Sequence, residues 1–175
     1  MDHQDSREIS RNHRNDLAGE HKFGDVGQIT IAFLFGVTWI GDSFMLNYTT
    51  FLNQYVSNFV RIPIAIVFFS ISFFLASMGL STVFGKKRKD PGVIRRNVFG
   101  VVRHPIYLSE ILLYLGFLML SISLTATLVL GFAIMFLHYI AKYEERLLLG
   151  HFGEEYSSYM RDVPMWIPRM WKGKR

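Results

Sequence analysis

Long apolar runs alternate with short charged segments along the chain. Residues 62–84 carry no charged side chain, and as an α-helix such a run spans the ~30 Å hydrocarbon core of a bilayer. Residues 26–46 and 106–140 each contain a single charged residue, Asp42 and Glu110 respectively. The pattern predicts membrane-spanning helices, because the helices of a soluble core have shorter, amphipathic runs.

The third apolar run is too long for one span. As a single helix, residues 106–140 would extend ~52 Å, well beyond the bilayer core. The hydroxyl-rich segment 121–127 is the natural place to turn, because Ser and Thr side chains can bond backbone groups that a reversal releases. We therefore expect an all-α integral membrane fold of four transmembrane helices, over about residues 26–46, 62–84, 106–121 and 125–142.

The basic residues favour this division and orient the chain. With four spans, residues 1–25, 85–105 and 141–175 share one side and hold 4, 7 and 7 of the 19 Lys and Arg residues, leaving only Arg61 on the other. By the positive-inside rule we expect a multi-pass protein with both termini cytoplasmic. Residues 1–25 would form a cytosolic tail and 26–175 a single domain. Asp42 is expected at the far interface or in a loop.

Composition excludes several kinds of chemistry. The chain has no cysteine, which rules out disulfides, thiolate metal sites and a cysteine nucleophile. No two of its six histidines lie three to five residues apart, and no Gly-x-Gly occurs, so we expect neither a helical metal site nor a dinucleotide loop. The net charge of +5 comes from residues that flank apolar runs, which indicates contact with lipid headgroups rather than nucleic acid.

Two polar motifs flank the third apolar run. Arg103-His104-Pro105-Ile106-Tyr107 enters it, and Lys142-Tyr143-Glu144-Glu145-Arg146 leaves it. If the run doubles back, the two motifs meet at the same membrane surface. Pro105 suits the first turn of a helix, whose unpaired N–H groups, with Arg103 and His104, suit a carboxylate or phosphate. The alternative is a snorkelling arginine and an interfacial tyrosine, both common at membrane borders.

Three acidic residues extend this candidate site. Glu110 follows Tyr107 by three residues on the same helical face, at a depth where an acid usually faces a cavity or a partner. Glu144 and Glu145 oppose the helix dipole, so a cation should compensate for them; the alternative is a charged helix end with local ion pairs. Residues 147–160, with their apolar and aromatic side chains, predict a cytosolic helix lying at the interface.

The order of these motifs resembles a known family. Arg103-His104-Pro105-x-Tyr107, then Glu144-Glu145, then residues 152–159 (Phe-Gly-Glu-Glu-Tyr-x-x-Tyr) and Val163-Pro164 resemble the isoprenylcysteine carboxyl methyltransferase and phospholipid methyltransferase superfamily. The resemblance covers roughly residues 85–168, which would be the cofactor-binding region. It implies an integral membrane enzyme that binds S-adenosylmethionine with a helical hairpin and its cytosolic flanks.

The resemblance also implies site residues. Those expected to bind the cofactor are Pro91, Gly92, Val93, Ile94, Phe99, Arg103, His104, Pro105, Ile106, Tyr107 and Glu144. Arg103 or His104 can pair with the methionyl carboxylate and Glu144 with its ammonium, while an aromatic ring suits the sulfonium. Glu110 and Glu145 are the candidate catalytic bases for a protonated amine. The chain departs from the family pattern at Asn97 and Phe99, where Gly and Tyr are usual, and at Ile140, where the prenylcysteine enzymes have a substrate-binding Arg.

The sequence therefore predicts a membrane methyltransferase that transfers a methyl group from S-adenosylmethionine to a lipid-like or small hydrophobic acceptor. A phospholipid amine, a prenylcysteine carboxylate and a thiol all remain open as acceptors, with Ile140 favouring an apolar one. The bilayer and the acceptor are the expected partners, and the oligomeric state is open. The alternative is a non-catalytic membrane scaffold or assembly protein that retains the fold.

Overall fold

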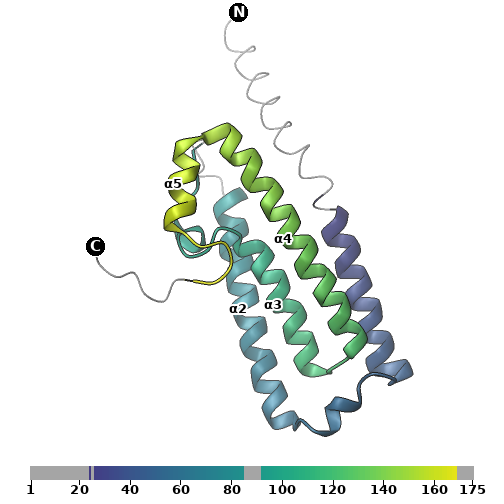
Figure 1. Cartoon of the computed structure of the whole chain (residues 1–175). Coiled ribbons are helices and arrows are strands. Elements are labelled where there is room, and N and C mark those ends of the chain that lie inside the picture. Colours follow the sequence, from purple (N-terminus) through teal and green to yellow (C-terminus); the bar gives the residue numbers. More distant parts are fainter. Residues whose placement is uncertain (1–23, 25, 85–91, 169–175) are drawn as a thin grey trace, which may run out of the picture.

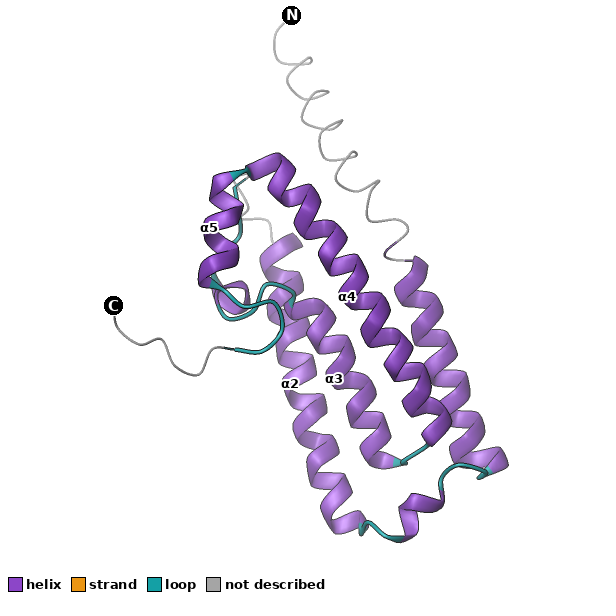
Figure 2. Cartoon of the chain, in the orientation of Figure 1, coloured by secondary structure: helices purple, strands orange, loops and turns teal. Residues whose placement is uncertain are grey.

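The computed structural model describes residues 24, 26–84 and 92–168, and all regular elements within these residues are helical (Figure 2). Three helices have the length and composition to cross a membrane: the first helix (Val26–Leu46), α2 (Asn58–Phe84) and α4 (Leu124–Phe152). Helix α3 (Pro105–Leu120) is apolar but shorter, and α5 (Glu154–Asp162) is amphipathic. Two short 3₁₀ helices cover Phe51–Gln54 and Asn97–Gly100, and the first helix ends in the π-helical turn Gly41–Leu46.

The long helices form an elongated bundle in which α3 lies between α2 and α4 (Figure 1). The first helix packs against α3 and α4, where Phe35 stacks on Tyr114 with 4.4 Å between ring centroids. These two residues belong to a buried cluster with Leu118, Leu130 and Ala133 and their neighbours. We call the end of the bundle where α3 passes into α4 the turn end, and the opposite end, covered by α5, the α5 end (Figure 1).

The predicted reversal of the third apolar run is confirmed. Helix α3 ends at Leu120 and α4 begins at Leu124, so residues 121–123 make the turn. Ser123 caps α4 by accepting a hydrogen bond from the backbone N–H of Ala126 at 3.1 Å. A hydroxyl thus satisfies a backbone donor that the reversal leaves without a helical partner, as the sequence predicted.

Asp42 lies in the last turns of the first helix, and the expectation that it lies in a loop past that helix is wrong. It sits in the π-helical turn with 5% of its surface exposed, and its carboxylate accepts hydrogen bonds from hydroxyls of Thr49, Ser123 and Thr125. The Ser123 bond is 2.6 Å and the Thr125 bond 3.2 Å. A buried acid needs such donors, and here they come from two different turns. Asp42 therefore ties the first helix to the α3–α4 hairpin.

Arg61 ties α2 to the α3–α4 hairpin at the turn end of the bundle. Its guanidinium donates to the backbone carbonyl of Leu120 at 3.1 Å and to the side-chain oxygens of Asn53 and Asn58. Asn53 in turn accepts from the N–H of Ile122 at 2.8 Å. Arg61 is 7% exposed, so the one basic residue predicted on the far side is part of a buried network that joins α2 to the hairpin.

Small residues let α2 and α3 approach closely. A Cβ on Gly116 would lie 2.5 Å from Cε1 of Phe69, so only glycine leaves room for this ring. The hydroxyl of Ser72 donates to the carbonyl of Ser109 at 2.7 Å across the same interface. Close backbone approach and such interhelical bonds are the usual means of association between membrane helices.

Two predicted boundaries differ from the structure. Instead of ending near residue 142, α4 runs for 29 residues from Leu124 to Phe152, because Lys, Glu, Arg and Leu are all good helix formers. The predicted interfacial helix over residues 147–160 is therefore divided: its first part belongs to α4, and α5 begins after Gly153. Gly153 has φ 53° and ψ −123°, a backbone conformation that only glycine adopts readily.

Candidate active site

His104 is the centre of the polar cluster at the α5 end of the α3–α4 hairpin. It is the N-cap residue of α3 and is 7% exposed. Its Nε2 lies 3.3 Å from Oε1 of Glu145, and its Nδ1 lies 3.7 Å from Oε2 of Glu144. The predicted meeting of the two polar motifs is confirmed, since both carboxylates come from α4 and the imidazole from the start of α3.

The guanidinium and the backbone N–H of Arg103 both form hydrogen bonds with other parts of the protein. Its Nε and one terminal nitrogen lie 2.8 and 2.7 Å from Oε1 of Glu145, and the other terminal nitrogen donates to the carbonyls of Met160 and Val163 at 3.0 and 2.7 Å. Its backbone N–H donates to the carbonyl of Pro164 at 3.0 Å. Arg103 therefore clamps the segment after α5 against the start of α3.

The two glutamates differ in their surroundings. Glu145 is 2% exposed, and besides Arg103 and His104 it has the ammonium of Lys142 3.5 Å from Oε2. Glu144 is 18% exposed and accepts a 2.5 Å hydrogen bond from the hydroxyl of Tyr107. Glu145 is thus the anchor of the cluster, whereas Glu144 lies closer to its open side.

Aromatic rings enclose the imidazole. The ring of Tyr107 is nearly parallel to that of His104, with an interplanar angle of 4° and 5.6 Å between centroids. The indole of Trp166 lies 5.8 Å from the same imidazole, and its N–H donates to Nδ1 of His138 at 3.1 Å. Sequence reasoning did not assign Trp166 or His138 to the site, because 28 residues and a helix separate them and no spacing rule joins them.

Helix α5 links the segment before Arg103 to this cluster. The hydroxyl of Tyr159 donates to the carbonyl of Phe99 at 2.7 Å. Glu155 accepts from the N–H of Val93 at 3.2 Å, and Val93 packs against the cluster around Tyr159. Burial raises the pKa of the Tyr159 hydroxyl to about 12, against the opposing effect of Arg103, so this hydroxyl remains a neutral donor at physiological pH.

The remaining residues expected to bind the cofactor are distributed around the cluster. Gly92 lies beside Glu155, whose Oε1 would be 3.6 Å from a Cβ on the glycine. Pro105 is buried, and Ile106 packs against Gly79 of α2. Ile94 and Phe99 are half-buried. Pro91 lies outside the described residues.

Glu110 lies farther along α3, toward the first helix. It is half-buried and accepts a 2.5 Å hydrogen bond from the hydroxyl of Tyr114, whose ring stacks on Phe35 of the first helix. Six residues of helix separate it from His104, a rise of ~9 Å. Glu110 thus has a partner on its own helix, one turn farther from the imidazole.

Two of the three positions that depart from the family pattern, Asn97 and Ile140, have clear structural surroundings. Asn97 has φ 56°, in the left-handed region that glycine and asparagine adopt most readily, and its amide donates to the hydroxyl of Thr82 at 3.1 Å. Asparagine therefore preserves the backbone that glycine would give. Ile140 lies beside Gly24, ahead of the first helix, and its Cγ2 would be 3.5 Å from a Cβ on that glycine.

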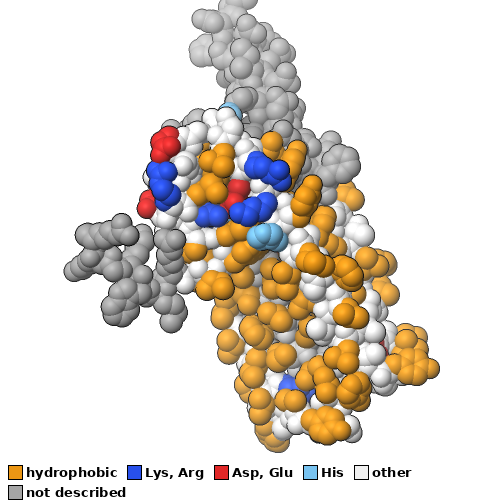
Figure 3. All heavy atoms as spheres, in the orientation of Figure 1, with side chains coloured by type: hydrophobic (Ala, Val, Ile, Leu, Met, Phe, Trp, Pro, Cys, Tyr) orange, Lys and Arg blue, Asp and Glu red, His pale blue; other side chains and the backbone are white. Residues whose placement is uncertain are grey.

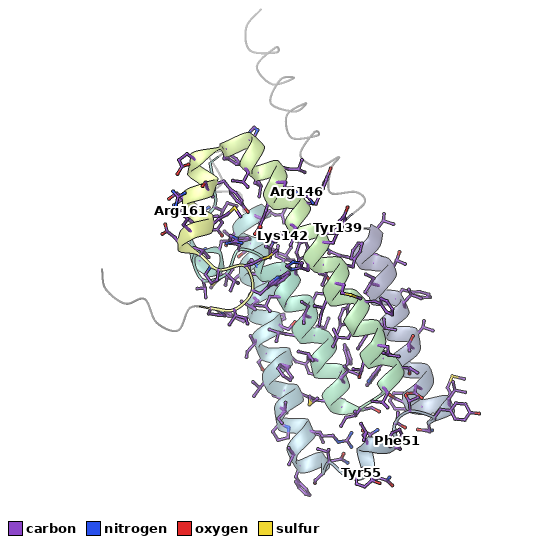
Figure 4. All side chains as sticks on the ribbon, in the orientation of Figure 1. Phe51, Tyr55, Tyr139, Lys142, Arg146 and Arg161 are labelled. Carbon is purple, nitrogen blue, oxygen red and sulfur yellow. The ribbon has the colours of Figure 1, made fainter. Side chains whose placement is uncertain are left out.

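Figure 4 shows Lys142 and Arg146 on α4 near its α5 end, where they border the cluster.

Within residues 24, 26–84 and 92–168, no group of three or more His, Asp or Glu side chains could hold a metal ion. The site is therefore built from two carboxylates, an imidazole, two aromatic rings and a clamping guanidinium.

A family model described as phospholipid methyltransferase matches residues 56–155 of the chain. The chain belongs to this family. The match takes in α2, α3, α4 and the start of α5, and hence both polar motifs. The first helix lies outside the phospholipid methyltransferase match, as does the segment that carries Trp166.

Two curated relatives match shorter parts. The cobalt-zinc-cadmium resistance protein CzcN of Cupriavidus metallidurans is 33% identical over 85 residues, which is 47% of this chain and 38% of that protein. The protein-S-isoprenylcysteine O-methyltransferase of Schizosaccharomyces pombe is 31% identical over 87 residues, 49% of this chain and 37% of that enzyme. The matches thus span less than two fifths of each relative. No solved structure matches the chain.

Proposed function

We propose that the chain is an integral membrane enzyme that transfers a methyl group from S-adenosylmethionine to a lipid-like or small hydrophobic acceptor. The observation that carries the proposal is the contact of His104 with Glu144 and Glu145, at the end of a hairpin of apolar helices within the family match. Two carboxylates beside an imidazole and aromatic rings form a compact polar site next to a surface suited to lipid.

The residues fit the proposed cofactor. The carboxylate of Glu144, which remains partly exposed, suits the methionyl ammonium. His104 suits the methionyl carboxylate better than Arg103 does, because its Nδ1 lies 3.7 Å from Glu144, beyond a hydrogen bond, whereas all three side-chain nitrogens of Arg103 donate to Glu145 or to the carbonyls of Met160 and Val163. The aromatic ring of Tyr107 suits the positive sulfonium. When bound, S-adenosylmethionine supplies a methyl group that its positive sulfur has already activated.

Glu145 and Arg103 act as positioning residues in this proposal. Glu145 was also a candidate base, but its carboxylate has Arg103, His104 and Lys142 around it, an arrangement that suits an ionised anchor. It holds the imidazole of His104 and the Arg103 clamp in one place, and fixed geometry contributes much of the rate of an in-line displacement. Glu110 remains the candidate base for a protonated amine acceptor.

The comparisons bear on the class of acceptor, and the distribution of basic residues bears on the orientation in the membrane. The family description supports a phospholipid amine, and the name of the S. pombe relative supports a prenylcysteine carboxylate; a small thiol also stays open. We place the α5 end in the cytoplasm, because six of the seven Lys and Arg residues within the described ranges lie at that end, and only Arg61 lies at the turn end. The cofactor would then enter from the cytosol and the acceptor from the bilayer.

Calorimetry on detergent-purified protein tests the proposal. We expect S-adenosylmethionine to bind the wild type, and Glu144→Gln to weaken binding at least about tenfold, or ~1.4 kcal/mol. Glu154→Gln is the matched control, because Glu154 is an exposed acid on α5 that pairs with Arg161. No binding to a folded wild type would reject the proposal and favour the non-catalytic scaffold.

Product analysis then identifies the acceptor. Incubating the protein with a lipid extract and methyl-labelled S-adenosylmethionine should place the label on a phospholipid amine, a prenylcysteine ester or a thioether. Glu110→Gln should reduce turnover of an amine acceptor while sparing cofactor affinity, because a base is needed only for the transfer. Normal turnover in this variant would show that Glu110 has no chemical role.

A further inference from the structure

The segment after α5 brings Trp166 between His104 and His138. Arg103 holds the carbonyls of Met160, Val163 and Pro164, which directs the following residues toward α4. The indole N–H then donates to Nδ1 of His138 at 3.1 Å, and the two rings lie 6.3 Å apart. The indole therefore bridges from the start of α3 to the outer surface of α4.

This indole covers one face of the buried imidazole. His104 has Tyr107 at 5.6 Å and Trp166 at 5.8 Å between ring centroids. His104 is 7% exposed, whereas His138, on the other side of the indole, is exposed. Trp166 thus separates a buried ring of the site from the outer surface of α4.

The outer surface of α4 is apolar up to this point. Four large, exposed side chains follow one another at helical spacing: Leu128, Phe132, Met135 and Tyr139. Beyond them α4 carries Lys142 and Arg146 (Figure 4). In Figure 3 hydrophobic side chains cover most of the visible shaft of the bundle, and charged side chains gather at the α5 end. Trp166 bonds His138, which lies at helical spacing between Met135 and Lys142, and so contacts α4 where its apolar side chains give way to charged ones.

We infer that Trp166, held by His138, is a specificity-determining wall between the His104 site and the bilayer-facing surface of α4. An acceptor that approaches along α4 meets the indole before it meets the imidazole, so the wall limits the width of the head group that is admitted. The indole of Trp166 is half-buried, and its N–H has a hydrogen-bond partner in His138 that fixes the ring. The role in acceptor choice rests on the proposed function; the shielding of the site does not.

The absence of cysteine from the chain allows a direct test. Single cysteines at His104→Cys or Tyr107→Cys report access to the site in proteoliposomes. N-pyrenylmaleimide reaches them from the bilayer and a sulfonated maleimide from water. We expect Trp166→Ala to speed pyrenylmaleimide labelling at least tenfold and to change sulfonated labelling less than twofold.

The hydrogen-bond partner provides a graded comparison. His138→Leu keeps the indole but removes its acceptor, so it should speed pyrenylmaleimide labelling in the same direction. His138→Asn keeps a side-chain acceptor near the position of Nδ1 and should retain a rate within about twofold of the parent. A merely structural role for His138 would make both variants alike.

Ile167→Ala is the matched control, because Ile167 is the next residue along and is 79% exposed; it should leave both rates unchanged. Unchanged pyrenylmaleimide labelling in Trp166→Ala at both cysteine positions would overturn the inference, as would equal acceleration of both reagents. Using two cysteine positions keeps the test valid if one variant fails to fold. Calorimetry of S-adenosylmethionine is independent of this result, so failure of the wall and failure of the proposed function are distinguishable.

Discussion

Glu144 and Glu145 are adjacent in the chain, but the helix points their side chains about 100° apart and gives them different environments. Glu145 turns inward to Arg103 and His104 and is 2% exposed, whereas Glu144 keeps 18% of its side chain exposed beside Tyr107. A single helical step thus separates an anchoring carboxylate from one that a ligand can reach.

Replacing these two residues should change the free energy of unfolding by very different amounts. Glu145→Gln leaves the buried guanidinium of Arg103 without its counter-ion, so the free energy of unfolding should fall by about 3 kcal/mol. Glu144→Gln should change it by less than about 1 kcal/mol, because the side chain is partly exposed and glutamine keeps an oxygen that can accept from the Tyr107 hydroxyl. Unfolding in mixed detergent micelles measures both. Equal losses in the two variants would contradict the division of roles.

The sequence predicted some of these residues and missed others for a definite reason. His104 and the two glutamates follow from two motifs at the ends of one apolar run, so doubling back suffices to bring them together. Trp166 and His138 meet only because Arg103 binds carbonyls of the segment after α5. That path depends on backbone contacts across the fold, and no local pattern encodes it.

At the scale of helices, hydropathy located the apolar segments but not the ends of α4 and α5. The charged residues 142–146 look like the end of a span, yet they continue α4 because their side chains favour helix. The break comes at Gly153, whose backbone angles only glycine adopts readily. Recognising it would have required knowing that the chain must turn there to bring Tyr159 to Phe99.

Glycine also determines how closely α2 and α3 pack. Gly116→Ala would place a Cβ 2.5 Å from the ring of Phe69, so the free energy of unfolding should fall by about 1–3 kcal/mol from overpacking. Gly116→Ala combined with Phe69→Leu should recover part of this loss, since the smaller side chain relieves the contact.

Gly131→Ala is the control for this pair, because nothing lies within 4 Å of a Cβ at that position of α4. It should stabilise the protein by up to about 1 kcal/mol, the usual gain when alanine replaces glycine inside a helix. Unfolding in mixed micelles measures all three variants. A loss in Gly131→Ala as large as that in Gly116→Ala would show that the effect is not steric.

At the scale of the whole molecule, buried polar contacts hold the bundle together at both ends. Asp42 and Arg61 join the first helix and α2 to the hairpin at the turn end, and Arg103 joins α5 to the hairpin at the other. Both groups of contacts require α3 to extend from the turn end of the bundle to the α5 end. Its 16 residues extend only ~24 Å, less than the ~30 Å of a typical bilayer core.

The side of the membrane that the site faces depends on whether α3 crosses the bilayer. Labelling a cysteine at each of two surface positions shows on which side each position lies. Tyr55 is 75% exposed at the turn end and Arg161 lies on α5 (Figure 4). If all four helices cross, these positions lie on opposite sides. Tyr55→Cys should then react with an impermeant maleimide on intact cells and Arg161→Cys only after permeabilisation, with the cysteine-free wild type as control. If α3 does not cross, the parity of spans changes and both positions react from one side, which would contradict a hairpin that returns both polar motifs to the cytoplasmic surface.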